Sequence, residues 1–442
     1  MSRYRRWRGC QEGRSENPPV THRIAGDRSY QCGDLVDVAA MAGLEKHCHR
    51  AFPGTPQGRG IGDWRWVRNM KVFFVSTMYP RDAAGYRGVF IRNMVFGLAR
   101  APSIELNVWA PPGELPEGAA KATTRSDSDW LGKLVDLGGI SHMMRSGGVR
   151  ALLSPVRLLR ILAAAYRRQR DVDVYHINWL QSALPLPRDG KPALITVLGN
   201  DLRLLGLPFM RPLLRRVMRH RRVAICPNAE WMCEPLQRAF GDIAEIQPIS
   251  FGIDPVWYAI QRKPLDQSPK RWLVVARLTA EKMGPLFEWS RSLFEDGSRE
   301  LHLFGPMEQT IDVPSWVHYH GPAAPEQLAR EWFPQACGLI TLSRHAEGRP
   351  QVMLEAMAAG MPIIASRMPA HATVVTDGET GLLCDSPQSY GDALARLEDA
   401  ATNQQFGEAA RRRVNDELGT WDDCAQRYIR VYNRLRGDTH GG

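Results

Sequence analysis

Short apolar runs rich in β-branched residues alternate with helix-like segments between residues 70 and 366, and this alternation constrains the fold more than any other feature. Parallel strands that are buried on both faces have such continuous apolar sequences, and the segments between them supply the helical crossovers. The pattern occurs twice, on either side of a polar, Pro-containing segment at 261–270. The sequence therefore predicts an α/β protein with two doubly wound domains. The expected strands are 72–76, 104–109, 174–177, 193–197 and 223–226, followed by 272–276, 301–304, 317–319, 338–342 and 363–365.

Residues 1–69 differ from the rest of the chain. They mix Arg, Gly, Pro, Ser and His with little periodicity, a composition that buries little surface and favours disorder. Met70 and Lys71 are followed at once by the first expected strand. We therefore expect residues 1–69 to be a disordered extension upstream of a biological start at Met70. The two domains are expected at 70–255 and 268–415.

Bulk properties exclude several classes of protein. No apolar run approaches the roughly 20 residues that span a bilayer, and the basic first residues are not followed by the apolar segment of a secretory signal. The 8 cysteines are scattered without paired spacing, which favours reduced thiols in a cytoplasmic protein.

The segment 343–366 carries the densest set of chemical signals. A polar turn that contains Glu347 leads into an expected helix at 352–359 and places Glu355 in the first turn of that helix. Backbone N–H groups at a helix start attract anions and hydroxyls, so this arrangement favours a hydroxyl-rich ligand beside a phosphate. The alternative is that Glu355 stabilises the helix N-terminus by its charge alone.

Together with a basic pair, Arg277 and Lys282, in the loop after strand 272–276, this segment resembles the signature of the retaining family 4 glycosyltransferases. The resemblance covers about residues 70–435 and is most specific in the C-terminal domain. It implies the GT-B fold, in which two Rossmann-like, doubly wound domains face an interdomain cleft. It also implies that the segment 416–442 forms a helix that crosses back to the N-terminal domain.

The resemblance assigns the donor to the C-terminal domain. Arg277 and Lys282 would stabilise the negative charge that develops on a diphosphate when the sugar leaves. Gly305, at the end of strand 301–304, would let the nucleotide base approach the backbone. The alternatives are two ordinary surface cations and a glycine needed for packing.

Donor hydroxyls are assigned to the other motif. Glu347, with the backbone N–H groups of Gly348 and Arg349, would hold the sugar, and Glu355 would hold the ribose. Pro350 has no N–H and cannot contribute.

The N-terminal domain matches the family less closely. Gly88, in the loop after the first strand, would contact the phosphates. The segment 174–179 resembles a strand-end segment of the family that often carries two histidines; His176 fills the first place, and Asn178 stands where the second would be. A core His176 with satisfied hydrogen bonds is the alternative reading.

One further element, at 195–202, resembles a His-Gly-x-Asp sequence of the family. Gly199 and Asp201 are present, but Leu198 replaces the histidine. These departures put in doubt any mechanism that needs an N-terminal histidine near the sugar. Asp201 is expected to orient the loop or to bind the acceptor.

Positive charge is concentrated in the N-terminal domain. Residues 71–250 carry 25 basic and 15 acidic side chains, whereas residues 251–442 carry 20 and 25. The amphipathic segments 156–170 and 211–222 are strongly cationic, which favours docking on an anionic membrane that holds a lipid-linked acceptor. The alternative is two ordinary helices with basic outer faces. No motif favours a nucleic-acid partner.

The sequence thus predicts a retaining glycosyltransferase, free of metal and cofactor, that moves a sugar from a nucleotide diphosphate sugar to a glycan or lipid-linked acceptor. Its expected place is the cytoplasm, or the inner face of the membrane as a peripheral protein. Two alternatives remain open: another GT-B enzyme such as a nucleotide-sugar epimerase, and a non-catalytic protein that binds nucleotide sugars.

Overall fold

The computed structural model describes residues 69–82, 87–138, 153–199, 201–265, 268–345 and 348–437. These residues belong to one compact unit, Trp66–Gly442. The expected extension at 1–69 lies outside the described residues except for Asn69, and so does the predicted site residue Glu347.

The N-terminal domain is built on a parallel sheet of seven strands in the order β3-β2-β1-β4-β5-β6-β7. Its first strand pairs with β2 on one side and with β4 on the other, so the chain reverses its direction of growth between β1 and β4. The strands are β1 (Met70–Val75), β2 (Ile104–Trp109), β3 (Ala119–Lys121), β4 (Val174–Asn178), β5 (Ala193–Val197), β6 (Val223–Pro227) and β7 (Glu245–Ile246).

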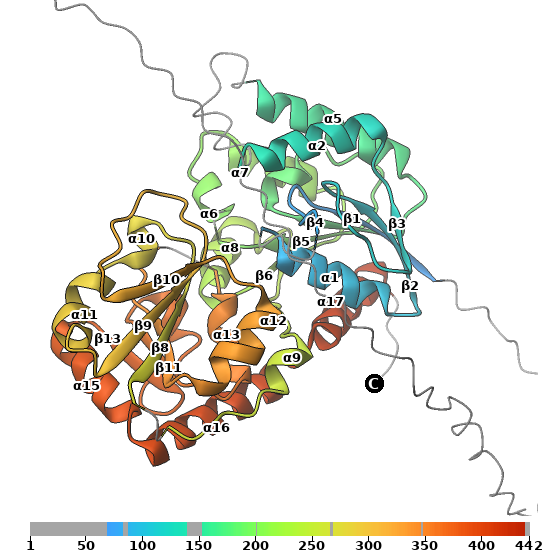
Figure 1. The fold of residues 1–442 in the computed structure, drawn as a ribbon. Coiled ribbons are helices and arrows are strands. Elements are labelled where there is room, and N and C mark those ends of the chain that lie inside the picture. The colour runs from blue at the N-terminus through green and yellow to red at the C-terminus, as the bar shows by residue number, and fades with distance from the viewer. Residues whose placement is uncertain are drawn as a thin grey trace, which may run out of the picture. The chain divides into compact units, whose positions relative to one another are not determined.

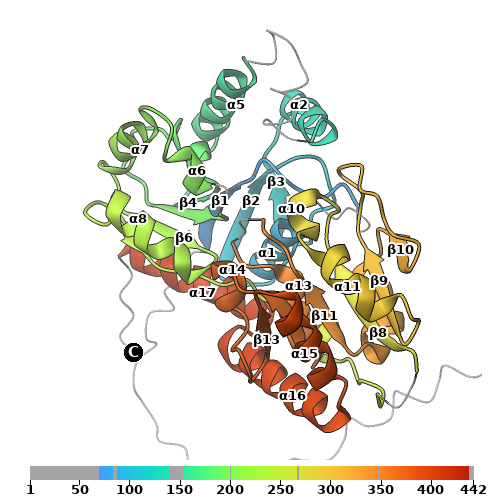
Figure 2. The same ribbon diagram turned by 90° about the vertical axis from the view of Figure 1, so that its left-hand side faces the viewer.

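Helices cover both faces of this sheet, as its apolar strands require (Figure 1). One face packs against α2 (Arg125–Asp136), α5 (Ser154–Arg168), α7 (Met210–Met218) and α8 (Cys233–Phe240). The other face packs against α1 (Val89–Ala99) and the last helix, α17 (Trp421–Arg436). Figure 2 shows α5 and α7 on the side of the sheet away from α17.

The C-terminal domain repeats this plan with six parallel strands in the order β10-β9-β8-β11-β12-β13. The strands are β8 (Lys270–Val275), β9 (Arg299–Phe304), β10 (Val317–Gly321), β11 (Gly338–Thr341), β12 (Ile363–Ser366) and β13 (Gly381–Cys384). The helices that position the site and the core are α9 (Pro255–Tyr258), α10 (Ala280–Met283), α11 (Leu286–Phe294), α13 (Gln351–Ala358), α15 (Pro387–Leu397) and α16 (Ala400–Glu417). Here the order reverses between β8 and β11, which pair with each other.

The chain returns to the first domain after α16. Gly419 has a φ of +62°, a conformation that favours glycine. The next residue, Thr420, is the N-cap of α17. Trp421, Cys424 and Tyr428 of α17 are buried against α1 and the N-terminal sheet. Figures 1 and 2 both show α17 next to that sheet.

Several elements differ from the sequence prediction. β3 and β7 were not expected, because β3 is Ala-Ala-Lys and β7 has two residues, so neither has a recognisable apolar run. β13 was also missed, although it is the short apolar run Gly-Leu-Leu-Cys. α2 was also missed, although Thr124 and Asp127 form a capping box at its start. α13 begins at Gln351, one residue earlier than expected.

Candidate active site at the strand ends of the C-terminal domain

The two predicted motifs lie on neighbouring loops. One follows β8 and the other follows β11, and these strands are adjacent at the point where the strand order reverses. In open parallel sheets, ligands bind at the carboxyl ends of the strands on either side of such a reversal. The topology therefore brings the loop of Arg277 and Lys282 together with the loop that leads to α13.

Direct contacts join the two loops. Glu281 of α10 bonds to the Nδ1 atom of His345 at 2.6 Å, and its carbonyl accepts from the Arg344 N–H at 2.8 Å. Gly284 has a φ of +52°, and a Cβ atom there would lie 2.2 Å from the Leu342 carbonyl oxygen. The hydrogen bonds and the close approach fix the geometry of the loop after β8 relative to the loop after β11.

Arg277 and Lys282 occupy the loop as predicted, and Thr279 caps the short helix α10 that carries Lys282. The Nη1 atom of Arg277 donates to the Oε2 atom of Glu308 at 2.8 Å, and the arginine side chain is 45% exposed. Arg277 is therefore paired with a carboxylate, and nearly half of its side chain remains exposed to solvent.

The backbone geometry at position 305 requires a glycine. Its φ is +135°, and a Cβ atom would lie 1.8 Å from the carbonyl oxygen of Ala276. The glycine therefore lets the loop after β9 contact the backbone just before Arg277. The close packing against Ala276 is sufficient to explain why a glycine is present at position 305; no described contact concerns a nucleotide base.

Glu355 lies one turn inside α13, because this helix begins at Gln351; the expectation that it sits in the first turn was wrong. Burial, with a smaller effect of the nearby Asp254 carboxylate, raises the pKa of Glu355 to about 7. No hydrogen bond or ion pair connects its carboxylate to another described side chain. A partly buried acid without a donor partner is suited to accept hydrogen bonds from ligand hydroxyls.

Gly348 and Arg349 lead the chain into α13 along the N-terminal domain. The Gly348 carbonyl accepts from Trp231 Nε1 at 2.9 Å, and Arg349 Nη1 donates to Ser250 Oγ at 2.6 Å. A Cβ atom on Gly348 would lie 2.5 Å from Asn228 Oδ1. Their backbone N–H groups have no acceptor among the described residues and remain available to a ligand.

His176 is a core residue rather than a residue that faces the acceptor. Its side chain is fully buried, its Nδ1 atom bonds to Tyr432 Oη at 2.5 Å, and its Nε2 atom bonds to Thr196 Oγ1 at 2.9 Å. Burial lowers the pKa of His176 to about 3, so the ring is neutral. Both ring nitrogens are occupied, and His176 thereby links α17 to the N-terminal sheet. The structure therefore does not place His176 where it could contact a substrate, as the prediction had it.

Asp201 is also buried, and it joins two strand-end loops. Its Oδ2 atom accepts from the Leu198 N–H at 2.7 Å, and its Oδ1 atom accepts from the Leu180 N–H at 3.2 Å. Burial raises the pKa of Asp201 to about 6. Of its two expected roles, the structure shows the orientation of the loop, in which Gly199 adopts a φ of +104°.

Asn178 is fully buried at the end of β4, where its Nδ2 atom donates to the Val75 carbonyl at 3.0 Å. Its Oδ1 atom has no hydrogen-bond partner among the described residues. Trp179 follows with a φ of +70°, a conformation that bulky side chains rarely adopt and that sequence analysis did not anticipate.

Two residues of the site were missed. Arg87 precedes Gly88, whose φ of +83° starts α1, and Arg87 Nη2 donates to the Oε1 atom of Glu308 at 3.0 Å. Glu308 lies three residues after Gly305, so the rule that polar residues cluster at strand ends could have found it. No comparable signal indicated its pairing with Arg87, which is 221 residues away.

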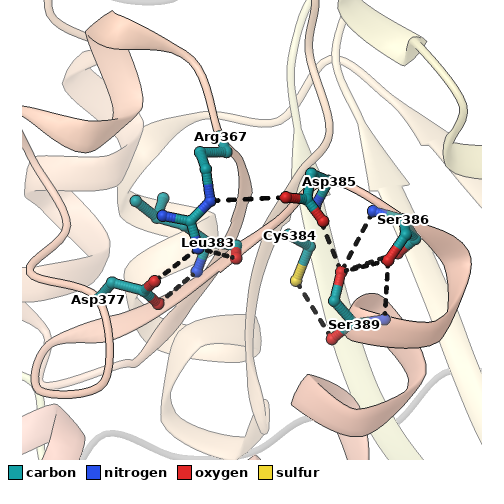
Figure 3. A network of polar contacts seen from close by, with 7 residues as sticks. All are labelled: Arg367, Asp377, Leu383, Cys384, Asp385, Ser386 and Ser389. Atoms are coloured by element: carbon teal, nitrogen blue, oxygen red, sulfur yellow. Dashed lines mark hydrogen bonds and ion pairs between the residues drawn. The ribbon is translucent and has the colours of Figure 1, made fainter.

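The carboxyl ends of β12 and β13 are fixed by a polar network (Figure 3). Arg367 Nη2 donates to Asp377 Oδ2 at 2.7 Å and to the Leu383 carbonyl at 3.0 Å, while Asp377 Oδ1 accepts from the Leu383 N–H. Ser386 and Ser389 then form the capping box that starts α15. These turns are therefore held by partners within the domain, in contrast to Glu355.

No grouping of three or more His, Cys, Asp or Glu side chains within residues 69–437, apart from the segments left undescribed, has the geometry to hold a metal ion. Nor is any helix of the described ranges long and apolar enough to cross a membrane.

Comparison with known proteins identifies the C-terminal part of the chain. Residues 317–413 match the family described as glycosyl transferases group 1. A D-inositol 3-phosphate glycosyltransferase from Corynebacterium diphtheriae is 32% identical over 129 residues, which are 28% of this chain and 29% of that protein. An N-acetyl-alpha-D-glucosaminyl L-malate synthase from Bacillus anthracis is 32% identical over 106 residues, which are 23% and 28% of the two chains. The matched part thus spans less than a third of the length of these relatives.

Solved structures share the fold over most of the chain. Sucrose-phosphate synthase from Thermosynechococcus elongatus superposes with a TM-score of 0.62 at 17% identity, covering 84% of this chain and 100% of that chain. HepE from Anabaena, solved in complex with UDP-glucose, superposes with a TM-score of 0.57 at 12% identity, covering 83% and 100%. The two parallel sheets therefore form a GT-B fold, and within the C-terminal sheet domain residues 317–413 are similar to the glycosyl transferases group 1 family.

Proposed function

We propose that this protein is a retaining, metal-independent glycosyltransferase that transfers a hexosyl group from a nucleoside diphosphate sugar to a glycan or lipid-linked acceptor. One observation carries the proposal. Arg277 and the approach to α13 lie on the two loops that flank the strand-order reversal of the C-terminal sheet. Such a position supports a site that holds a diphosphate and ligand hydroxyls together.

The residues divide the donor between them. Arg277 and Lys282 bind the diphosphate and stabilise the charge that develops on its leaving oxygen. The Glu355 carboxylate accepts hydrogen bonds from the ribose hydroxyls. The free N–H groups of Gly348 and Arg349, with Glu347, bind the sugar.

The proposed transfer takes place on one face of the sugar. The acceptor hydroxyl oxygen forms a bond to the anomeric carbon on the side from which the diphosphate leaves. The bond between that carbon and the phosphate oxygen breaks, and its electron pair stays on the phosphate. The hydroxyl proton passes to a phosphate oxygen, so no protein nucleophile or metal is needed. The anomeric proton coupling of the product, measured by NMR, tests retention; an inverted product contradicts it.

Donor binding is tested with a matched pair of arginines, one near each end of β8. Arg277 follows the carboxyl end of this strand and pairs with Glu308, whereas Arg271 lies near its amino end and pairs with Glu300. We expect Arg277→Gln to weaken binding of the preferred donor, chosen from UDP-, GDP- and ADP-sugars by calorimetry, whereas Arg271→Gln leaves it unchanged. UDP-glucose is the first probe, because HepE was solved with it. Tight nucleotide binding without transfer or donor hydrolysis would indicate a non-catalytic binding protein.

A lipid-linked acceptor is supported by the outer surface of the N-terminal domain. Around α5 and α7, five large apolar side chains are exposed, and Phe209 is 77% exposed with a φ of +65°. The five are Leu153, Val156, Leu207, Phe209 and Leu213. Exposed arginines accompany them, among them Arg157, Arg160, Arg211 and Arg216. Apolar side chains with basic neighbours favour the interface of an anionic membrane.

Vesicle flotation tests this surface, and with it a peripheral location on the inner face of the membrane. We expect the protein to bind vesicles that contain phosphatidylglycerol more strongly than neutral vesicles, and Phe209→Ser to reduce that binding. Met307, 43% exposed in the C-terminal domain, provides the control Met307→Ser. Equal loss in both variants, or no binding at physiological salt, contradicts the membrane proposal.

A further inference from the structure

One carboxylate, that of Glu308, binds two arginines from different domains. Its Oε1 atom accepts from Arg87 Nη2 at 3.0 Å, and its Oε2 atom accepts from Arg277 Nη1 at 2.8 Å. Arg87 belongs to the loop after β1, and Arg277 belongs to the loop after β8. The two guanidinium groups therefore meet at a single anion.

The backbone that carries Glu308 is held firmly. The N–H groups of Glu308 and Gln309 both donate to the Leu278 carbonyl, at 3.2 and 3.1 Å, and the Leu278 N–H donates to the Pro306 carbonyl at 2.9 Å. The side chain of Gln309 accepts from the Ala280 N–H at 2.9 Å. The loop after β9 is thus held against the loop of Arg277 by hydrogen bonds that do not involve Arg87.

The three side chains of this cluster differ in their exposure to solvent. The Glu308 side chain is 20% exposed, whereas those of Arg87 and Arg277 are 40% and 45% exposed. Two guanidinium groups thus share the one carboxylate of Glu308. A diphosphate carries more negative charge and more acceptor oxygens than one carboxylate, and arginine pairs with phosphate in a bidentate geometry.

We propose that Glu308 occupies, in the ligand-free protein, the place that a donor phosphate takes between Arg277 and Arg87. Donor binding displaces the carboxylate, and Arg87 becomes a second diphosphate-binding residue, supplied by the N-terminal domain. Glu308 is then a competitor that lowers donor affinity. This inference rests on the proposed donor site and adds to it a residue from the opposite domain.

The sign of one substitution tests the inference. If Glu308 competes with the phosphate, Glu308→Gln tightens UDP binding about two- to tenfold, the size expected for release of a partly exposed ion pair. If Glu308 instead holds Arg277 ready for the phosphate, the same substitution weakens binding. Arg87→Gln is expected to weaken UDP binding about tenfold in both the wild-type and the Glu308→Gln backgrounds.

A matched control comes from the same two strands. Glu300 lies at the amino end of β9, is 26% exposed and pairs with Arg271 at 3.1 Å. Glu300→Gln should leave UDP affinity unchanged. Binding is measured by isothermal titration calorimetry, and thermal unfolding of each variant establishes that it is folded.

The outcomes separate the inference from the proposed function. A wild-type protein that binds UDP, GDP and ADP no better than Arg277→Gln overturns the donor site, and the inference with it. If Arg277→Gln weakens binding but folded Glu308→Gln and Arg87→Gln both match the wild type, the donor site stands and the role of Glu308 is overturned.

Discussion

Polar residues end the strands of both sheets, but the two sets have different surroundings. In the N-terminal domain, His176 and Asp201 are fully engaged by partners within the protein. In the C-terminal domain, Glu355 has no described donor and Arg277 is nearly half exposed. Polar residues near strand ends therefore have two different roles that the sequence does not distinguish. Some stabilise the fold, and others remain available to bind a ligand.

The largest expected effect is that of Arg277→Gln. Removing a cation that stabilises a developing phosphate charge should lower the transfer rate about a hundred- to a thousandfold. The unfolding temperature should change little, because the pair with Glu308 is partly exposed. Single-turnover kinetics with the preferred donor and thermal unfolding measure the two quantities. An unchanged transfer rate would show that Arg277 does not take part in the reaction.

Asp201→Ala should lower the stability of the protein rather than its affinity for the donor. The substitution leaves the buried N–H group of Leu180 and the partly buried N–H group of Leu198 without their acceptor. We therefore expect a loss of about 2 kcal/mol in the free energy of unfolding. Donor affinity of the folded fraction should remain close to that of the wild type. Urea unfolding and calorimetry test this; a stable variant that loses donor binding contradicts the structural role.

His176→Phe should also lower the free energy of unfolding, by less than Asp201→Ala does. It leaves the hydroxyls of Tyr432 and Thr196 without their partner, which costs about 1–2 kcal/mol. Because the ring is buried and neutral, the pH dependence of transfer should not change. A shifted pH profile in a stable variant would show that His176 takes part in the reaction.

The smallest predicted effect concerns pH and Glu355. Its pKa of about 7 is raised above the value of an exposed glutamate, so the ligand-free protein loses stability as pH rises from about 4.5 to about 7. Donor binding favours the ionised carboxylate, so affinity for a nucleotide sugar should increase about tenfold between about pH 6 and about pH 8.

The substitution Glu355→Gln provides the control for this effect. It should flatten both dependences, stabilise the ligand-free protein above about pH 7 and weaken donor binding. Calorimetry with UDP-glucose is suitable, because its phosphates carry no group that titrates in this range. A variant that retains the wild-type pH dependence would assign it to another group.

Much of the fold could be predicted because buried parallel strands are continuous apolar runs. The ranges 104–109 and 193–197 coincide with β2 and β5. The short strand β3, Ala-Ala-Lys, has too weak an apolar run for such a signal and is recognised only by its pairing with β2. β13, Gly-Leu-Leu-Cys, does contain a short apolar run next to β12, and the prediction missed it.

The site was predictable to the extent that it depends on local sequence. Arg277 and Gly348 lie at the ends of predicted strands or helices, and the structure places them there. The pairing of Arg87 with Glu308, and the burial of His176 against Tyr432, depend on residues 221 and 256 positions apart. Such contacts depend on how the domains pack, which no local pattern encodes.

Hydrogen–deuterium exchange with the preferred nucleotide sugar tests the central claim most directly, because it observes both sets of strand ends in one experiment. We expect saturating donor to protect residues 276–284, 305–309 and 348–358, with smaller changes at 176–202. Protection confined to 176–202, or none in a sample that calorimetry shows to be saturated, would contradict the assignment of the donor to the C-terminal domain.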